Sequence, residues 1–116
     1  MLTGAMLGLM QSVGQDIVTL AGDLDDVEFF SSRITLAETL RKLASMSRNA
    51  QYMPFEIKVR THKIDWASWV ALDVALVKPS HHRLQIWVAI RELTPQTLRH
   101  LDEYRRKDPY LFSIFP

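Results

Sequence analysis

Residues 66–77, Trp-Ala-Ser-Trp-Val-Ala-Leu-Asp-Val-Ala-Leu-Val, decide the fold class, because this apolar segment fits two kinds of secondary structure. As a strand, residues 69–77 carry apolar side chains on both faces: Val70, Leu72, Val74 and Leu76 on one, and Trp69, Ala71, Asp73, Ala75 and Val77 on the other. As a helix, the segment aligns apolar residues at a period near 3.6: Trp66, Val70, Val74 and Val77. We favour the strand, which joins the segments on either side into a simple sheet.

The segments on either side of this stretch also alternate. Residues 55–61 place apolar side chains on one face, Phe55, Ile57 and Val59, and polar ones on the other. Residues 84–90 have apolar side chains on both faces: Leu84, Ile86, Val88 and Ile90 on one, and Trp87 and Ala89 beside Gln85 on the other. The connections, residues 62–67 and 78–82, have hairpin length, so we predict a three-stranded antiparallel β-meander.

Helical periodicity predicts two helices before the meander. An amphipathic helix near the amino terminus ends at Gly22, and the acidic residues that follow favour a short helical turn. A second long helix begins near Leu36, where Thr35 and Glu38 have the spacing of a capping box, and it ends near Asn49.

A further helix follows the meander. Thr94 is placed to cap it and Pro95 suits its first turn, while Asp108 and Pro109 end it. The apolar tail beyond Pro109 is expected to dock on its own domain or on a neighbour. The predicted fold is therefore a single α+β domain over residues 1–116, with two N-terminal helices, a three-stranded antiparallel β-meander, a C-terminal helix and an apolar tail.

The predicted meander has more apolar surface than one covering layer can bury. Such a patch on a small protein usually marks a contact site. We therefore predict a non-enzymatic protein-interaction module of the adaptor, chaperone or inhibitor type, which forms a homodimer or docks a protein partner through a Trp-bearing sheet face. On this face Asp73 needs a partner such as Arg91. The predicted interface comprises Trp69, Ala71, Asp73, Trp87, Ala89, Arg91, Phe112 and Phe115.

Composition argues against several other classes. With 14 basic and 13 acidic residues, the net charge of +1 gives no field that would attract nucleic acid or a membrane. The chain has no cysteine, and its serines lie in no Gly-x-Ser-x-Gly context. We expect no cofactor. The amino terminus lacks the basic residues of a signal peptide, so we expect a cytoplasmic protein.

Two alternative functions stay open at this stage. A nucleic-acid-binding module would use basic residues beside the tryptophans of the sheet: Lys58, Arg60, Lys63, Lys78 and Arg83. A metal-dependent hydrolase would use the histidines of the two hairpin connections, His62, His81 and His82. Asp65 or Asp73 could complete that metal site, and the spacing selects neither.

Overall fold

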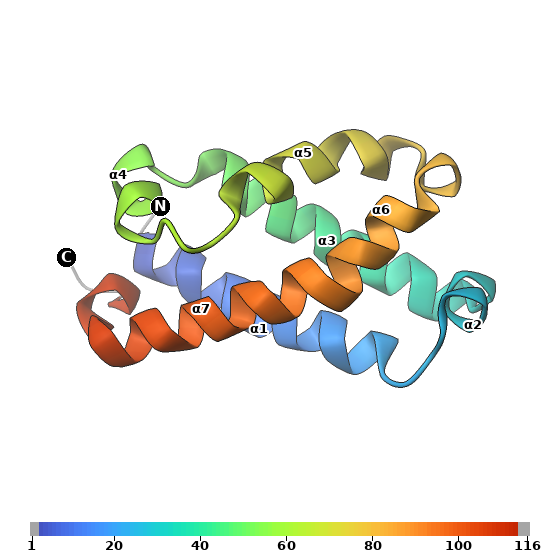
Figure 1. Ribbon diagram of the computed structural model, residues 1–116, viewed down its shortest axis with the longest axis horizontal. Helices are drawn as coiled ribbons and strands as arrows, with labels where there is room; N and C mark the ends of the chain where they lie inside the picture. Colours follow the sequence, from blue (N-terminus) through green and yellow to red (C-terminus); the bar gives the residue numbers. More distant parts are fainter. Residues whose placement is uncertain (1–2, 114–116) are drawn as a thin grey trace.

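Helices make up all the regular secondary structure of residues 3–113, the part of the chain that the computed structural model describes (Figure 1). The α-helices are α1 (Thr3–Ala21), α2 (Asp26–Ser31), α3 (Arg33–Tyr52), α4 (Phe55–Arg60), α5 (Trp66–Val77), α6 (Arg83–Val88) and α7 (Thr94–Lys107). The other elements are the 3₁₀ turns η1 (Pro79–His81) and η3 (Pro109–Phe112) and the π-helical η2 (Ala89–Leu93).

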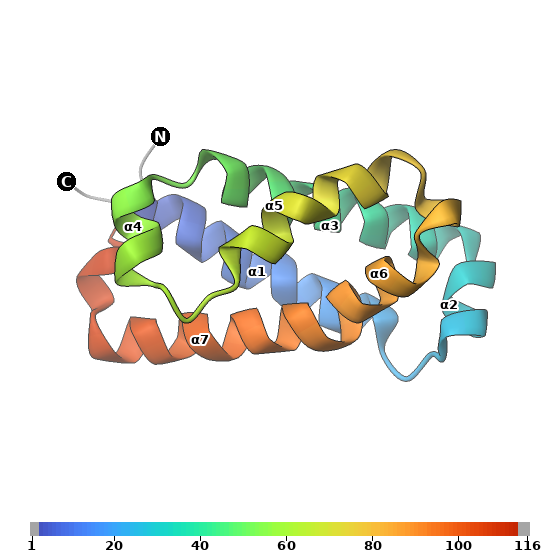
Figure 2. The same cartoon turned by 45° about the horizontal axis from the view of Figure 1, so that its top comes forward.

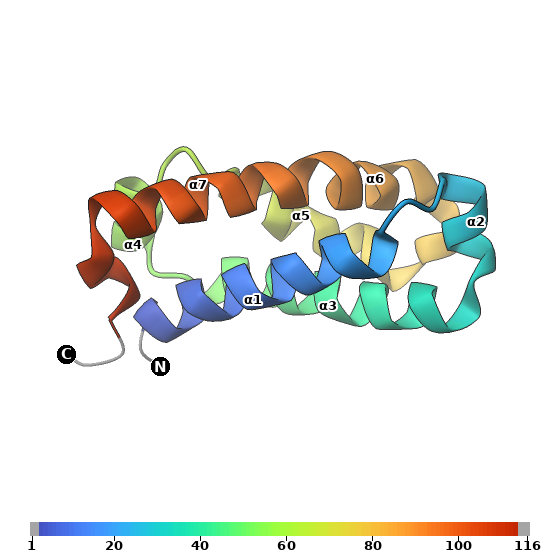
Figure 3. The same ribbon diagram turned by 90° about the horizontal axis from the view of Figure 1, so that it is seen from below.

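The long helices lie along one another in an elongated body of 43 × 25 × 21 Å. α1 packs against α3, α3 against α5, and α7 against α1. α6, η2 and α7 follow one another as a single run of helix (Figures 2 and 3). The short helix α2 lies at one end of the body, and α4 lies at the other end with both chain termini.

The predicted β-meander is wrong, and with it the α+β fold class. Residues 3–113 contain no strand, and the three expected strands are the helices α4, α5 and α6. The helical alternative for residues 66–77 is correct. Because this segment is apolar at almost every position, it fits a period of two as well as a period of 3.6, and packing against α3 selects the helix.

The buried side of α5 also differs from the side that the helical alternative aligned. Trp66, Trp69, Leu72 and Ala75 are buried, at helical spacing. Trp69 lies fully inside, where its indole Nε1 donates a hydrogen bond of 2.8 Å to Thr97 Oγ1 on α7. The valines of α5 point the other way and are exposed.

The helix-end predictions have mixed outcomes. Gly22 ends α1 with a positive φ of 49°, as expected. The acidic residues after it do begin a short helix, and Asp25 and Glu28 form a reciprocal capping box. The box expected at Thr35 and Glu38 is wrong, because α3 already begins at Arg33 and both residues lie inside the helix.

Thr94 was expected to cap a separate helix, and this prediction is also wrong. Helical backbone runs through Thr94, whose hydroxyl donates a hydrogen bond of 2.7 Å to the carbonyl of Ala89, five residues earlier. Pro95 explains the widened turn, because its ring would crowd the carbonyl of Arg91 in a regular α-helix. The π-helical turn η2 just before the proline accommodates it. Such turns often occur at functional sites.

No helix within residues 3–113 is long and apolar enough to cross a membrane.

Candidate functional site: a groove beside the π-helical turn

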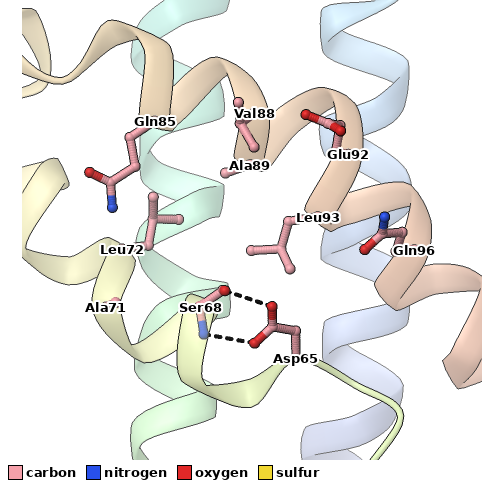
Figure 4. A pocket seen from close by; sticks show the side chains of 10 residues that line it. All are labelled: Asp65, Ser68, Ala71, Leu72, Gln85, Val88, Ala89, Glu92, Leu93 and Gln96. Carbon is pink, nitrogen blue, oxygen red and sulfur yellow. Dashed lines mark hydrogen bonds between the residues drawn. The ribbon is translucent and has the colours of Figure 1, made fainter.

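A groove of about 300 Å³ lies between α5 and the run of helix formed by α6, η2 and α7 (Figure 4). It passes directly over η2. Its lining comprises Asp65, Ser68, Ala71, Leu72, Gln85, Val88, Ala89, Glu92, Leu93 and Gln96.

The floor of the groove is apolar. Leu72 of α5 and Leu93 of η2 face each other across it in Figure 4, and both are buried. Ala89 lies buried beside them at the start of the π-helical turn. Ala71 and Val88 extend the apolar lining toward the surface. A ligand in this groove would therefore cover the exposed apolar atoms of Ala71 and Val88, above floor side chains that are themselves buried.

The rim of the groove is polar and acidic. Asp65 precedes α5 and caps it, accepting hydrogen bonds from the Ser68 N–H at 3.1 Å and the Ser68 hydroxyl at 2.6 Å. Glu92 also stands at the rim, and its carboxylate has no hydrogen-bond or ion-pair partner within residues 3–113. Gln85 and Gln96 add amide groups. The lining contains no basic side chain, so its formal charge comes from the carboxylates of Asp65 and Glu92 alone.

The outer side of α5, next to the groove, is also apolar. Val70, Val74 and Val77 are 37%, 71% and 75% exposed. With the neighbouring Ala67 they form a continuous strip along the helix, which we call the valine face. A helix that is apolar on all sides is normally covered on all sides. Within residues 3–113, no element covers the valine face of α5.

The predicted interface residues do not share one surface. Trp69 and Ala89 are buried within the chain, and Phe112 is buried under Arg105, whose guanidinium carbon lies 4.3 Å from the ring centre. Ala71 and Asp73 are exposed on α5. Phe115 lies outside the described residues.

Trp87 and Arg91, also predicted as interface residues, make contacts within the chain. Trp87 is half-buried in an aromatic cluster, with its ring centre 5.4 Å from that of Phe29. Arg91 stacks on Trp87 and donates a hydrogen bond of 2.8 Å to the carbonyl of Gly22, and another to that of Leu24. It therefore completes the carboxyl end of α1. The expected pairing of Asp73 with Arg91 does not form.

The basic residues of the nucleic-acid alternative are spread over both ends of α5, a helix of 12 residues and about 18 Å. Lys58, Arg60 and Lys63 precede it, and Lys78 and Arg83 follow it. Arg60 forms an ion pair with Asp108 at 2.7 Å. Since the sheet that was to present these residues does not exist, the nucleic-acid interface predicted on it is wrong.

The histidines of the metallohydrolase alternative are separated in the same way. His62 lies before α5, while His81 and His82 lie after it. No group of three or more His, Cys, Asp or Glu side chains within residues 3–113 is placed to hold a metal ion. The hairpin that was to bring these histidines together is a helix, which holds its two ends apart.

Of the groove residues, the sequence predicted only Ala71 and Ala89 as part of an interface, on a sheet face that does not form. Asp65 was considered only as a metal ligand, and Glu92 and Gln96 carried no signal, because isolated polar residues on a helix are usually solvated. The one available signal was the helical alternative for residues 66–77, which would have placed Asp65 and Ser68 in the first turn of a helix.

Comparison with known proteins yields no assignment: no family model, no curated protein and no solved structure matches this chain.

Proposed function

We propose that the groove binds a small organic cation that has an apolar part. The single observation that carries this proposal is the composition of the lining, which combines an apolar floor with two carboxylates and no basic side chain. The protein-interaction module predicted on a sheet face is not retained, because that face does not exist. The cytoplasmic location expected from the sequence stays a prediction.

The two carboxylates at the rim of the groove favour a positively charged ligand. The carboxylate of Glu92 is exposed at the rim and has no partner within the described chain. Asp65 already accepts two hydrogen bonds from Ser68, so it contributes charge while its position stays fixed. An ammonium group at the rim would be attracted to both carboxylates and could donate hydrogen bonds to the amide oxygens of Gln85 or Gln96.

The volume of the groove limits the size of the ligand, and the apolar floor favours an apolar group next to its cationic one. A space of 300 Å³ corresponds to about ten water molecules, since each occupies about 30 Å³ in the liquid. An amine with about ten non-hydrogen atoms therefore fits. Its apolar part would lie on Leu72, Ala89 and Leu93, which favours an aryl or alkyl group over a sugar-like one.

The test uses three probes that share a phenylethyl or phenylpropyl body and differ in charge. These are 2-phenylethylammonium, the neutral 2-phenylethanol and the anionic 3-phenylpropionate. Binding is measured by titration with amide and methyl NMR shifts. We expect the cation to bind more tightly than the alcohol and the anion to bind least, with the largest shifts at Ala71, Ala89 and Leu93. Cation binding should weaken as salt is added.

A matched pair of variants locates the charge effect. Glu92→Gln keeps the shape of the rim and removes its free charge, so we expect the affinity for the cation to fall about threefold to tenfold, with little change for the alcohol. Glu56→Gln removes an exposed carboxylate on α4 that is not part of the groove lining, and should leave both affinities unchanged. Equal affinity for cation and alcohol, or shifts outside the groove, would contradict the proposal.

A further inference from the structure

The valine face of α5 has the spacing of a coiled-coil seam. Ala67, Val70, Val74 and Val77 follow one another at intervals of three, four and three residues, as do the a and d positions of a heptad repeat. Leu72 lies on the opposite side of the helix and is 1% exposed, so the core of the chain and the seam occupy opposite faces of α5. The seam therefore projects directly away from the body.

We propose that a second copy of this chain covers the valine face, with α5 packed on α5 in a parallel, two-fold symmetric seam. A two-fold pair needs only one self-complementary strip, which the valine face provides. This inference concerns a different side of α5 from the groove and does not rest on the ligand proposed there.

The charged residues beside the seam favour a parallel over an antiparallel orientation of the two α5 helices. With Ala67 and Val74 at a positions, Asp73 occupies g, and Lys78, the C-cap residue just beyond the last helical residue Val77, follows where the next e position would fall. In a parallel pair, g of one helix faces the next e of the other, so Asp73 of each copy would meet Lys78 of the second copy. An antiparallel pair centred on the same valines would bring the two Asp73 carboxylates together instead.

Both side chains are available for this pairing. Asp73 and Lys78 are exposed, and neither side chain has a hydrogen-bond or ion-pair partner inside the described range 3–113. α5 is already held helical by its core face, so association does not require the helix to form. The seam contains only two a/d pairs on a helix of 12 residues, and we therefore expect a weak dimer whose population depends on protein concentration.

The first test introduces a charge into the seam. Sedimentation velocity over a wide concentration range should show reversible dimers of the wild type, and Val74→Glu should weaken the dimer about a hundredfold or more, because the seam would bury two like charges. Ile34→Glu is the matched control, since Ile34 is 82% exposed on α3 and outside the seam. Far-UV circular dichroism and urea unfolding check that both variants are folded.

The second test exchanges the flanking charges. Asp73→Lys should weaken the dimer about threefold to tenfold, and adding Lys78→Asp in the same chain should restore it. Restoration is the readout that a general effect on folding would not produce. A double variant as weak as the single variant would contradict the proposed pairing.

The third test fixes the direction of the seam. The chain has no cysteine, so single introduced cysteines give an unambiguous result. Under mild oxidation, Val77→Cys should form a disulfide between identical chains in a parallel seam. An antiparallel seam would instead cross-link Val77→Cys to Val70→Cys in a mixture of the two variants. A monomer at all concentrations, a dimer that Val74→Glu leaves intact, or the antiparallel cross-link would overturn the proposal.

Discussion

α1 and α5 are both rich in apolar residues, yet the chain leaves more large apolar side chains exposed on α5, where Val70, Val74 and Val77 are exposed, than on α1, where Leu9 is exposed. α1 contacts α3, α7 and, near its amino end, η3. α5 packs against α3 and α6, reaches α7 through Trp69, and leaves the valine face exposed. The folded chain therefore accounts for most of the apolar side chains of α1 but leaves the valine face of α5 without a covering element within residues 3–113. Apolar surface that the chain leaves uncovered is where contacts with other molecules are to be sought.

The largest loss of stability should come from a substitution on the buried side of α5. Trp69→Ala removes the largest fully buried side chain of the core and leaves Thr97 Oγ1 without its indole donor. We expect a loss of about 3–5 kcal/mol in the free energy of unfolding, because a cavity opens between α5 and α7. Urea unfolding followed by circular dichroism measures it. A loss below about 1 kcal/mol would mean that α5 does not bury this face.

The next largest effect should come from the contact of α1 with η3. A Cβ atom added at Gly4 would lie 2.0 Å from the backbone oxygen of Ser113, and backbone cannot turn aside as a flexible side chain can. We expect Gly4→Ala to cost about 3 kcal/mol. At Gly8 the nearest atom is Arg105 Nη2 at 3.9 Å, so Gly8→Ala should be neutral or stabilise the protein by up to about 1 kcal/mol. Equal effects of the two substitutions would contradict this difference.

A smaller effect should come from the carboxyl end of α1. Arg91→Ala removes a guanidinium that donates to the carbonyls of Gly22 and Leu24 and stacks on Trp87. We expect a loss of about 2 kcal/mol, since hydrogen bonds from a charged donor contribute more than neutral ones. Arg99→Ala, on the exposed side of α7, is the control and should change the free energy of unfolding by less than about 0.5 kcal/mol. Thermal unfolding of both variants compares them directly.

Local signals in the sequence predicted helix ends better than they predicted the fold class. Gly22 and the acidic residues after it predicted the end of α1 and the start of α2, because a positive φ and a capping carboxylate depend on a few neighbouring atoms. The period of residues 66–77 could not be settled in the same way. It depends on which faces meet α3 and α6, and those contacts are long-range.

The groove was still harder to predict, because its residues come from two separate stretches of sequence, 65–72 and 85–96. Asp65 and Ser68 begin α5, Gln85 belongs to α6, and Glu92 and Gln96 lie on either side of Pro95. Pro95 predicted a helix start, whereas the chain continues the helix through a π-helical turn. That turn places Ala89 and Leu93 in the groove floor, and its position follows from packing on α1 as well as from the proline.

The smallest effect should come from the outer side of α5, and adjacent residues test it. Val74→Thr preserves shape at a position that is 71% exposed, so we expect a change below about 0.5 kcal/mol in dilute protein. Ala75→Thr places the same side chain one residue further on, at a fully buried position, and should cost about 1–3 kcal/mol through overpacking. If the valine face is covered by a second copy, the wild-type unfolding midpoint should also rise with protein concentration, and Val74→Thr should reduce that rise. Similar costs at the two positions in dilute protein would show that α5 is not divided into a core face and an open face.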